Sequence, residues 1–255
     1  MKRARHLIAE AQPVNAARPA LWNLFEPMNE PMNVSDRPAL PRGPYLLCDD
    51  TVRPELPLGE KAARLLAGGA RILQLRMKRT PPREALAAAR EVVAACRRAG
   101  AVCLLNDRVD LALLAGADGV HVGDEDLPPE AARELLGPGK LVGVTVRNAA
   151  GARVAKEAGA DYVGVGPVFG TTTKQVPAPV LGVEPFAAVV RGSPLPVVGI
   201  GGVGLVNIAQ VAAAGAHGAA VVSDALLAED IAERVRHLLA AFDTGARGTT
   251  LGGAP

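Results

Sequence analysis

The sequence has few cysteines, few aromatic residues and little net charge, and each shortage narrows the class of protein. It contains three cysteines, aromatic residues make up 3% of it, and its formal net charge at pH 7 is +2. Cys48, Cys96 and Cys103 form no C-x-x-C pair, so we expect reduced, mostly buried thiols and a cytoplasmic protein. Because the sequence has no dense basic run, nucleic acid is not an expected partner.

Long apolar runs are also missing. None approaches the roughly 18 residues that a membrane span needs, and the basic start at residues 1–6 is not followed by the apolar region of a secretory signal. We therefore expect no membrane partner. Hydrophobic residues nevertheless make up 49% of the chain. With so few aromatics, most of them are Ala, Val and Leu, which suits tightly packed layers of helices and strands.

The two ends of the chain differ from its middle. Residues 1–43 hold the only tryptophan, Trp22, and keep no strand or helix period. We expect a partly disordered N-terminal extension there, with one short helix near residues 18–25. The Gly- and Thr-rich residues 243–255 are expected to form a disordered tail. The sequence assigns no role to the extension.

Residues 44–242 alternate short apolar runs with helical stretches eight times. Strands are predicted at 45–48, 71–75, 101–105, 119–122, 141–144, 162–165, 196–200 and 219–222. Helices are predicted at about 58–67, 82–98, 109–115, 127–136, 149–158, 184–191, 205–214 and 224–242. Eight such units predict a single α/β domain, a (β/α)₈ TIM barrel. The alternative is an open doubly wound sheet, which would usually carry a glycine-rich turn after its first strand; residues 48–51 contain no glycine.

Carboxylates follow two neighbouring predicted strands. Asn106 and Asp107 come after the third strand, and Asp126 comes after the fourth. Parallel neighbours lie about 4.8 Å apart, so the two carboxylates can face one small cation. Hard oxygen ligands of this kind suit Mg²⁺. The alternative is that these acids are solvated loop ends or helix caps.

The second predicted strand ends in two cations. Gln74, Arg76 and Lys78 alternate, so they point the same way while the chain stays extended. Two cations on one rim suit a multiply charged anion, although a solvated strand end would look similar. Thr145 follows the fifth predicted strand. His121 lies inside the fourth, where we expect it to pack rather than to catalyse.

Three later loops carry residues typical of phosphate sites. Hydroxyls and a lysine at 171–174 follow the sixth strand and could close over a phosphate. Gly201-Gly202 follows the seventh strand, and Val222-Ser223 follows the eighth. A phosphate site built from the last two loops is frequent in this fold. The alternative is that the threonines are ordinary loop residues and that the glycines only turn the chain.

Together these motifs resemble the thiamine phosphate synthase (thiamine-phosphate pyrophosphorylase) family over about residues 45–240. The resemblance rests on the order and spacing of Gln74-Leu75-Arg76-x-Lys78, Asn106-Asp107-Arg108-x-Asp110-Leu111-Ala112, Gly116-Ala117-Asp118-Gly119-Val120-His121-Val122-Gly123, Gly164-Val165-Gly166-Pro167-Val168-Phe169, Thr171-x-Thr173-Lys174, Gly201-Gly202 and Val222-Ser223.

The resemblance implies a transferase of thiamine biosynthesis. That family joins a hydroxymethylpyrimidine diphosphate to a thiazole phosphate and releases diphosphate, so the implied partners are small-molecule substrates and the implied cofactor is Mg²⁺. The implied metal ligands are Asp107 and Asp126. The implied pyrimidine diphosphate site is Gln74, Arg76, Lys78, Asn106 and Lys174, with Arg76, Lys78 and Lys174 catalytic. The implied thiazole phosphate site is Thr171, Thr172, Thr173, Gly202, Val222 and Ser223. The wider substrate-binding set adds Leu75, Met77 and Thr145.

Three positions depart from the family pattern. Met77 stands where an acid is common, Thr145 where Ser is usual, and Gly170 where Pro is common. None of them removes a charge from the implied metal or diphosphate site. Two rivals stay open: a thiazole tautomerase, which would not need both acids and the diphosphate cations, and a non-catalytic sensor of phosphate ligands. A homo-oligomer is possible, but the sequence decides neither the oligomeric state nor whether a carboxylated thiazole is preferred.

Overall fold

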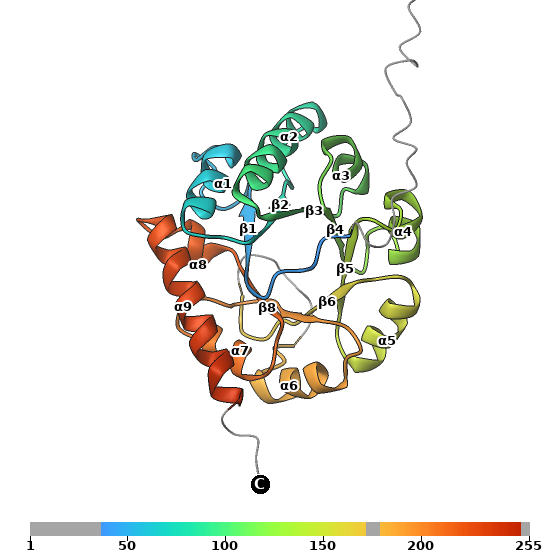
Figure 1. The fold of residues 1–255 in the computed structure, drawn as a ribbon, viewed down its shortest axis with the longest axis vertical. Coiled ribbons are helices and arrows are strands. Elements are labelled where there is room, and N and C mark those ends of the chain that lie inside the picture. The colour runs from blue at the N-terminus through green and yellow to red at the C-terminus, as the bar shows by residue number, and fades with distance from the viewer. Residues whose placement is uncertain (1–36, 172–178, 251–255) are drawn as a thin grey trace, which may run out of the picture. The chain divides into compact units, whose positions relative to one another are not determined.

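The protein folds as a closed barrel of eight parallel strands, each paired with the next and the last paired with the first. A computed structural model describes residues 37–171 and 179–250. Figure 1 shows the strands at the centre and the helices around them. The strands are β1 (Gly43–Asp49), β2 (Ile72–Arg76), β3 (Val102–Asn106), β4 (Gly119–Val122), β5 (Leu141–Val146), β6 (Tyr162–Val165), β7 (Val197–Gly199) and β8 (Gly218–Val221). The predicted TIM barrel is confirmed.

The helices form the outer layer. They are α1 (Leu58–Ala67), α2 (Pro82–Ala99), α3 (Val109–Ala115), α4 (Pro129–Leu136), α5 (Ala149–Glu157), α6 (Val183–Gly192), α7 (Ile208–Ala213), α8 (Ser223–Leu226) and α9 (Ile231–Thr250). Several begin with a proline in the first turn or end at a glycine, as in α2, where Gly100 takes the left-handed conformation. None of the helices within the described ranges is long and apolar enough to cross a membrane.

Strand alternation divides the apolar side chains between two cores. One face of each strand packs against the helices; Leu46 and Cys48 of β1, for example, join helix residues such as Leu65 in one buried cluster. The other face points into the barrel. There Tyr45, Ile72, Leu104, Leu141, Tyr162 and Val198 form a second cluster that fills the interior. Because the interior is closed by these side chains, a ligand has access only at an end of the barrel.

The last predicted helix is corrected by the structure. Instead of one helix over 224–242 there are two, α8 and α9, and α9 continues to Thr250. Asp230 starts α9 by accepting a hydrogen bond from Glu233 N at 2.9 Å, the usual role of an N-cap. Gly245, which we interpreted as part of a tail, permits close packing: a Cβ there would lie 2.2 Å from Ala209 O on α7. The predicted helix at 18–25 lies outside the described residues.

Gly143 makes room for a tyrosine inside the barrel. It pairs with Tyr162 in the β5–β6 register, and a Cβ at this position would lie 2.0 Å from Tyr162 Cζ. The tyrosine ring is fully buried. A methyl group at position 143 therefore has no space unless the ring moves.

We predict that Gly143→Ala lowers the free energy of unfolding by about 1–3 kcal/mol, because the added methyl overpacks the interior. Urea denaturation followed by circular dichroism measures this. The control is Gly248→Ala on α9, where no atom lies within 4 Å of the added Cβ. It should leave stability unchanged or raise it by about 0.5–1 kcal/mol. Equal stabilities for Gly143→Ala and the wild type would contradict the packing argument.

Candidate active site

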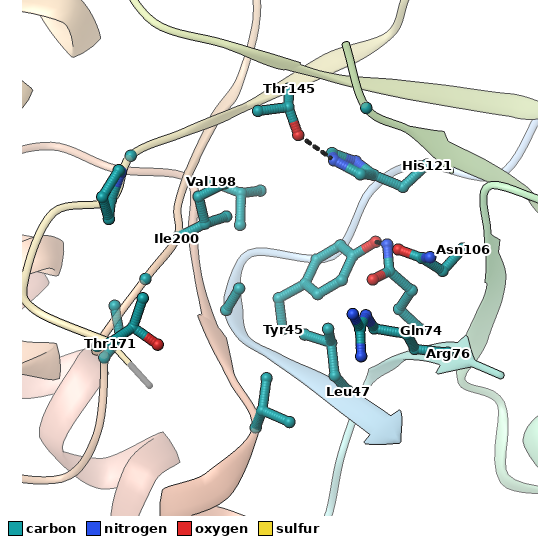
Figure 2. Close-up of a pocket in the computed structure, with 18 of the residues that line it drawn as sticks. Tyr45, Leu47, Gln74, Arg76, Asn106, His121, Thr145, Thr171, Val198 and Ile200 are labelled. Atoms are coloured by element: carbon teal, nitrogen blue, oxygen red, sulfur yellow. Dashed lines mark hydrogen bonds between the residues drawn. The ribbon is translucent and has the colours of Figure 1, made fainter. Parts of the chain in front are cut away.

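A cavity of about 620 Å³ opens at the carboxyl ends of the strands. Its volume is in the range of small-molecule sites. Figure 2 shows side chains from several strands pointing into it, among them Gln74, Arg76 and Asn106 on one side and Thr171 on another. Active sites of this fold lie at this end of the barrel.

Asp107 turns the chain at the mouth of the cavity. Its φ is +62°, in the left-handed region, which Asp adopts more readily than most residues. Such conformations gather at functional sites. The turn brings the Asp107 carboxylate beside Asn106, whose Nδ2 donates to Oδ2 at 2.5 Å, and beside the Lys78 ammonium, with which it forms an ion pair.

Asp126 reaches the same place from β4. Its Oδ2 accepts a hydrogen bond from Gly123 N at 2.8 Å. Burial raises the pKa of Asp107, contact with the Asp126 carboxyl raises that pKa further, and the Lys78 ammonium opposes both. The two carboxylates therefore converge, as the strand spacing predicted. The Lys78 ammonium, paired with Asp107, balances only one of the two carboxylates, and the remaining negative charge suits a divalent cation.

The donor set fits a cation that also binds a ligand. Among residues 37–171 and 179–250, no three or more His, Cys, Asp or Glu side chains cluster in a way that could hold a metal. Mg²⁺ usually takes one or two protein carboxylates and completes its shell with water and substrate phosphates. Asp107 and Asp126 match that pattern, with Arg76 and Lys78 lining the same cavity.

Asp49 orients Arg76, a role that the sequence reasoning missed. The Asp49 side chain is fully buried, and its Oδ2 accepts from Arg76 Nη1 at 2.6 Å. Its Oδ1 accepts from Thr51 N and Thr51 Oγ1, each at 2.6 Å. The buried Lys61 donates to the carbonyls of Asp49 and Val52, each at 2.8 Å. The guanidinium of Arg76 is thus held in one direction along the cavity wall.

Asp50 holds the segment that carries Lys78. Its carboxylate accepts hydrogen bonds from the backbone N–H groups of Lys78, Arg79 and Thr80 at 2.9, 2.7 and 2.9 Å. Thr80 Oγ1 donates as well, at 2.9 Å. Burial opposes ionisation, but these donors together lower the pKa of Asp50. The signal in the sequence was two consecutive acids at the end of the first strand, the position at which acids also follow β3 and β4.

Gly201 and Gly202 bring the loop after β7 against the loop after β6. Both have left-handed φ angles, +87° and +65°. A Cβ at Gly202 would lie 2.3 Å from Gly170 O, and one at Gly201 would lie 2.5 Å from Pro167 Cβ. Only glycine fits this approach. The cavity wall here also includes Thr171, Val222 and Ser223.

The structure places most of the predicted site residues around one cavity. Those that line it are Gln74, Arg76, Lys78, Asn106, Asp107, Asp126, Thr145, Thr171, Gly202, Val222 and Ser223. Leu75 and Met77 do not: alternation along β2 turns Leu75 into the core between sheet and helices, and Met77 packs against that core. Thr172, Thr173 and Lys174 lie outside the described residues. His121, expected only to pack, lines the cavity and hydrogen-bonds to Tyr162 and Thr145.

Comparisons with known proteins agree with the geometry. A model of the family described as "Thiamine monophosphate synthase" matches residues 44–225. The chain is 77% identical to a thiamine-phosphate synthase of Myxococcus xanthus over 214 residues, 84% of this chain and 98% of that protein. It is 49% identical to one of Anaeromyxobacter dehalogenans, covering 74% and 86%. A solved thiamine phosphate pyrophosphorylase from Pyrococcus furiosus superposes with a TM-score of 0.73 at 33% identity, covering 84% and 99%.

We predict that Asp50→Ala speeds hydrogen exchange of the amides of Lys78, Arg79 and Thr80 by at least about tenfold, because their acceptor is removed. Exchange measured by mass spectrometry on peptides that cover 76–82 checks this. Asp243→Ala, an exposed acid on α9, is the control and should leave these amides unchanged. Unaltered exchange at 78–80 in Asp50→Ala would show that other contacts hold the segment.

Proposed function

The chain belongs to the thiamine monophosphate synthase family and is a transferase of that family, and we propose that it makes thiamine phosphate by a Mg²⁺-assisted substitution at the mouth of the barrel. The observation that carries the proposal is the meeting of Asp107 and Asp126 beside Lys78 and Arg76 in one cavity. Two acids and two cations suit a diphosphate that arrives with a divalent ion.

The pyrimidine diphosphate binds on the β2–β3 side of the cavity in this proposal. Arg76 grips phosphate oxygens with a guanidinium that Asp49 already holds in place. Lys78 is about half exposed at the mouth, so it can turn from Asp107 towards the incoming diphosphate. Asn106 and Gln74 hold the ligand by hydrogen bonds. Lys174, outside the described residues, is assigned to the same diphosphate by the family resemblance.

The reaction proposed is a dissociative substitution. The bond between the pyrimidine methylene carbon and the diphosphate oxygen breaks, and its electron pair leaves with the diphosphate. The electron-rich aminopyrimidine stabilises the methylene cation, and the lone pair of the thiazole nitrogen then forms the new C–N bond. Bound Mg²⁺ supplies charge neutralisation on the departing diphosphate. Arg76 and Lys78 stabilise the same developing charge, and no covalent bond to the protein forms.

The thiazole phosphate is proposed to bind at the opposite wall. Thr171, Gly202, Val222 and Ser223 line it, and the glycine backbone at 201–202 allows a phosphate to approach the amide groups. Thr172 and Thr173, outside the described residues, complete the set that the resemblance implies. This division gives each substrate its own wall, so the nitrogen and the methylene carbon can meet between them.

The acids and cations also favour the synthase over its rivals. A thiazole tautomerase would not use a metal site together with Arg76 and Lys78, and a sensor would not need a leaving-group site. We propose further that the barrel at 44–242 is the catalytic part and residues 1–43 an extension, and that the protein is cytoplasmic. The free, buried thiols of Cys48, Cys96 and Cys103 suit a reducing compartment.

We predict that the purified protein, given both substrates, forms thiamine phosphate and releases diphosphate only when Mg²⁺ is present. Asp107→Asn should lower kcat by about 100-fold or more, because the amide keeps the left-handed turn but loses the negative charge. A coupled diphosphate assay and chromatography of the product measure both.

The matched control is Asp243→Asn, an exposed acid on α9, which should keep the wild-type rate. Circular dichroism confirms that each variant is folded. Full turnover in the absence of divalent ions, or in Asp107→Asn, would overturn the metal assignment. No diphosphate release from the wild type under any condition would overturn the synthase assignment itself.

A further inference from the structure

Five polar side chains form a continuous chain of hydrogen bonds across the barrel, along the wall of the cavity. Gln74 Nε2 lies 3.0 Å from the Tyr45 hydroxyl, and that hydroxyl lies 2.8 Å from the hydroxyl of Tyr162. The Tyr162 hydroxyl lies 3.0 Å from His121 Nδ1, and His121 Nε2 lies 3.0 Å from Thr145 Oγ1. Figure 2 draws this last bond as a dashed line. All five residues line the cavity, and Gln74 and Thr145 are the two ends of the hydrogen-bond chain.

The two tyrosines in the middle of this hydrogen-bond chain are almost inaccessible to water. Tyr45 and Tyr162 are buried inside the barrel, with their ring centroids 6.0 Å apart. Burial is the main cause that raises the pKa of both phenols well above its ordinary value. Both hydroxyls therefore stay protonated, and each has a single proton to donate. A buried donor without an acceptor is unfavourable, so the protons must be arranged consistently along the chain.

With a neutral His121 imidazole, only two arrangements satisfy every link. In one, protons are donated from Gln74 towards Thr145; in the other, they are donated in the reverse direction. Any mixture fails at the tyrosines. Either two hydroxyl oxygens face each other at 2.8 Å with no proton between them, or one tyrosine accepts from both of its neighbours and its own proton has no acceptor. Within the described ranges, the hydrogen-bond partners are Gln74 and Tyr162 for Tyr45, and Tyr45 and His121 for Tyr162.

The orientation of the Gln74 amide selects the first arrangement. Its Nε2, a donor only, faces Tyr45. The Tyr45 proton then goes to Tyr162, and the Tyr162 proton goes to His121 Nδ1. A neutral imidazole that accepts at Nδ1 carries its proton on Nε2, so it donates to Thr145 Oγ1. The hydroxyl proton of Thr145 is left to donate into the cavity.

We propose that this chain fixes the hydrogen-bonding polarity of the cavity, and that Tyr45, Tyr162 and His121 are positioning residues. Gln74 presents its carbonyl oxygen as an acceptor, and Thr145 presents its hydroxyl as a donor. The inference rests on the proposed function for the identity of the ligand. An aminopyrimidine offers amino N–H donors and ring-nitrogen acceptors, which complement this pair. An oxopyrimidine, with a carbonyl oxygen and a ring N–H, has the opposite pattern.

The two ends are also coupled. Reversing Gln74 to suit an oxopyrimidine requires reversal of every proton down to Thr145, or leaves a buried hydroxyl unpaired. Discrimination against the wrong pyrimidine therefore does not depend on Gln74 alone. In this proposal its strength also depends on Tyr45 and Tyr162, which act through the residues that they hydrogen-bond.

The tautomer of His121 tests the chain without substrates. In protein labelled with ¹⁵N-histidine, we expect the neutral His121 ring to carry its proton on Nε2; loss of the signals in His121→Gln assigns them. Tyr162→Phe removes the donor to Nδ1 and should shift the ring towards the other tautomer. Tyr45→Phe is the matched control: it leaves Tyr162 only His121 to donate to, so the Nε2–H form should persist.

A proton on Nδ1 in the wild type, or identical spectra for Tyr162→Phe and the wild type, would overturn the proposal. If Tyr162→Phe does not fold, the His121 tautomer in the wild-type spectrum alone supports or overturns the proposal. Because no turnover is involved, this result is independent of the proposed function.

The kinetic readout is selectivity. In the full enzyme, the ratio of kcat/KM for the aminopyrimidine over the oxopyrimidine diphosphate should fall by about tenfold or more in both tyrosine variants. A merely structural role would lower both values alike and leave the ratio unchanged, which would contradict the positioning role.

Discussion

The repulsion between two carboxylates is the constraint on which the site depends. Closing eight parallel strands into a barrel gathers all the loops that follow the strands at one end. Asp107 and Asp126 follow the neighbouring strands β3 and β4, so the pairing of these strands brings the two carboxylates together although their like charges repel. The raised pKa of Asp107, due first to burial and then to Asp126, is the sign of that conflict. In the proposed reaction, a divalent ion bound together with the diphosphate would offset this repulsion.

Other side chains hold the polar groups around this carboxylate pair in place. Asp49 holds the guanidinium of Arg76 and Asp50 holds the backbone at 78–80, so the side chain of one proposed diphosphate ligand and the backbone of the other are fixed before binding. On the inner side, the chain from Gln74 to Thr145 gives two cavity residues a defined hydrogen-bond direction. Preorganised groups of this kind stabilise a developing charge without having to reorient during the reaction. The apolar layer outside the strands gives these contacts a rigid support.

Much of the fold and of the site could be predicted from the sequence because both depend on the alternation of side chains along strands and on the order of the strands. Alternation placed Gln74, Arg76 and Lys78 on one side, and strand order placed Asp107 beside Asp126. The same rule excluded the side chains of Leu75 and Met77 from the cavity, but the resemblance had included them. Asp49, Asp50 and the tyrosine chain could not be predicted in this way. Their roles depend on three-dimensional contacts between β1 and β2 or across the barrel, which no local pattern specifies. The length of α9 was underestimated because the Gly- and Thr-rich residues from 243 were interpreted as a disordered tail, whereas Gly245 packs against Ala209 of α7.

The most direct test of the carboxylate pair is the effect of Mg²⁺ on thermal stability as a function of pH. The pKa of Asp107 is raised in the folded protein, so the metal-free pair is most favourable at acidic pH, and its contribution falls as pH rises above the ordinary value of an aspartate. Mg²⁺ should therefore raise Tm at neutral pH, by the equivalent of about 2.7 kcal/mol at 100 times its Kd, and progressively less towards about pH 4. It should not raise the Tm of Asp107→Asn. A Tm of the wild type that does not respond to Mg²⁺ at neutral pH, or responds equally in the variant, would contradict the account.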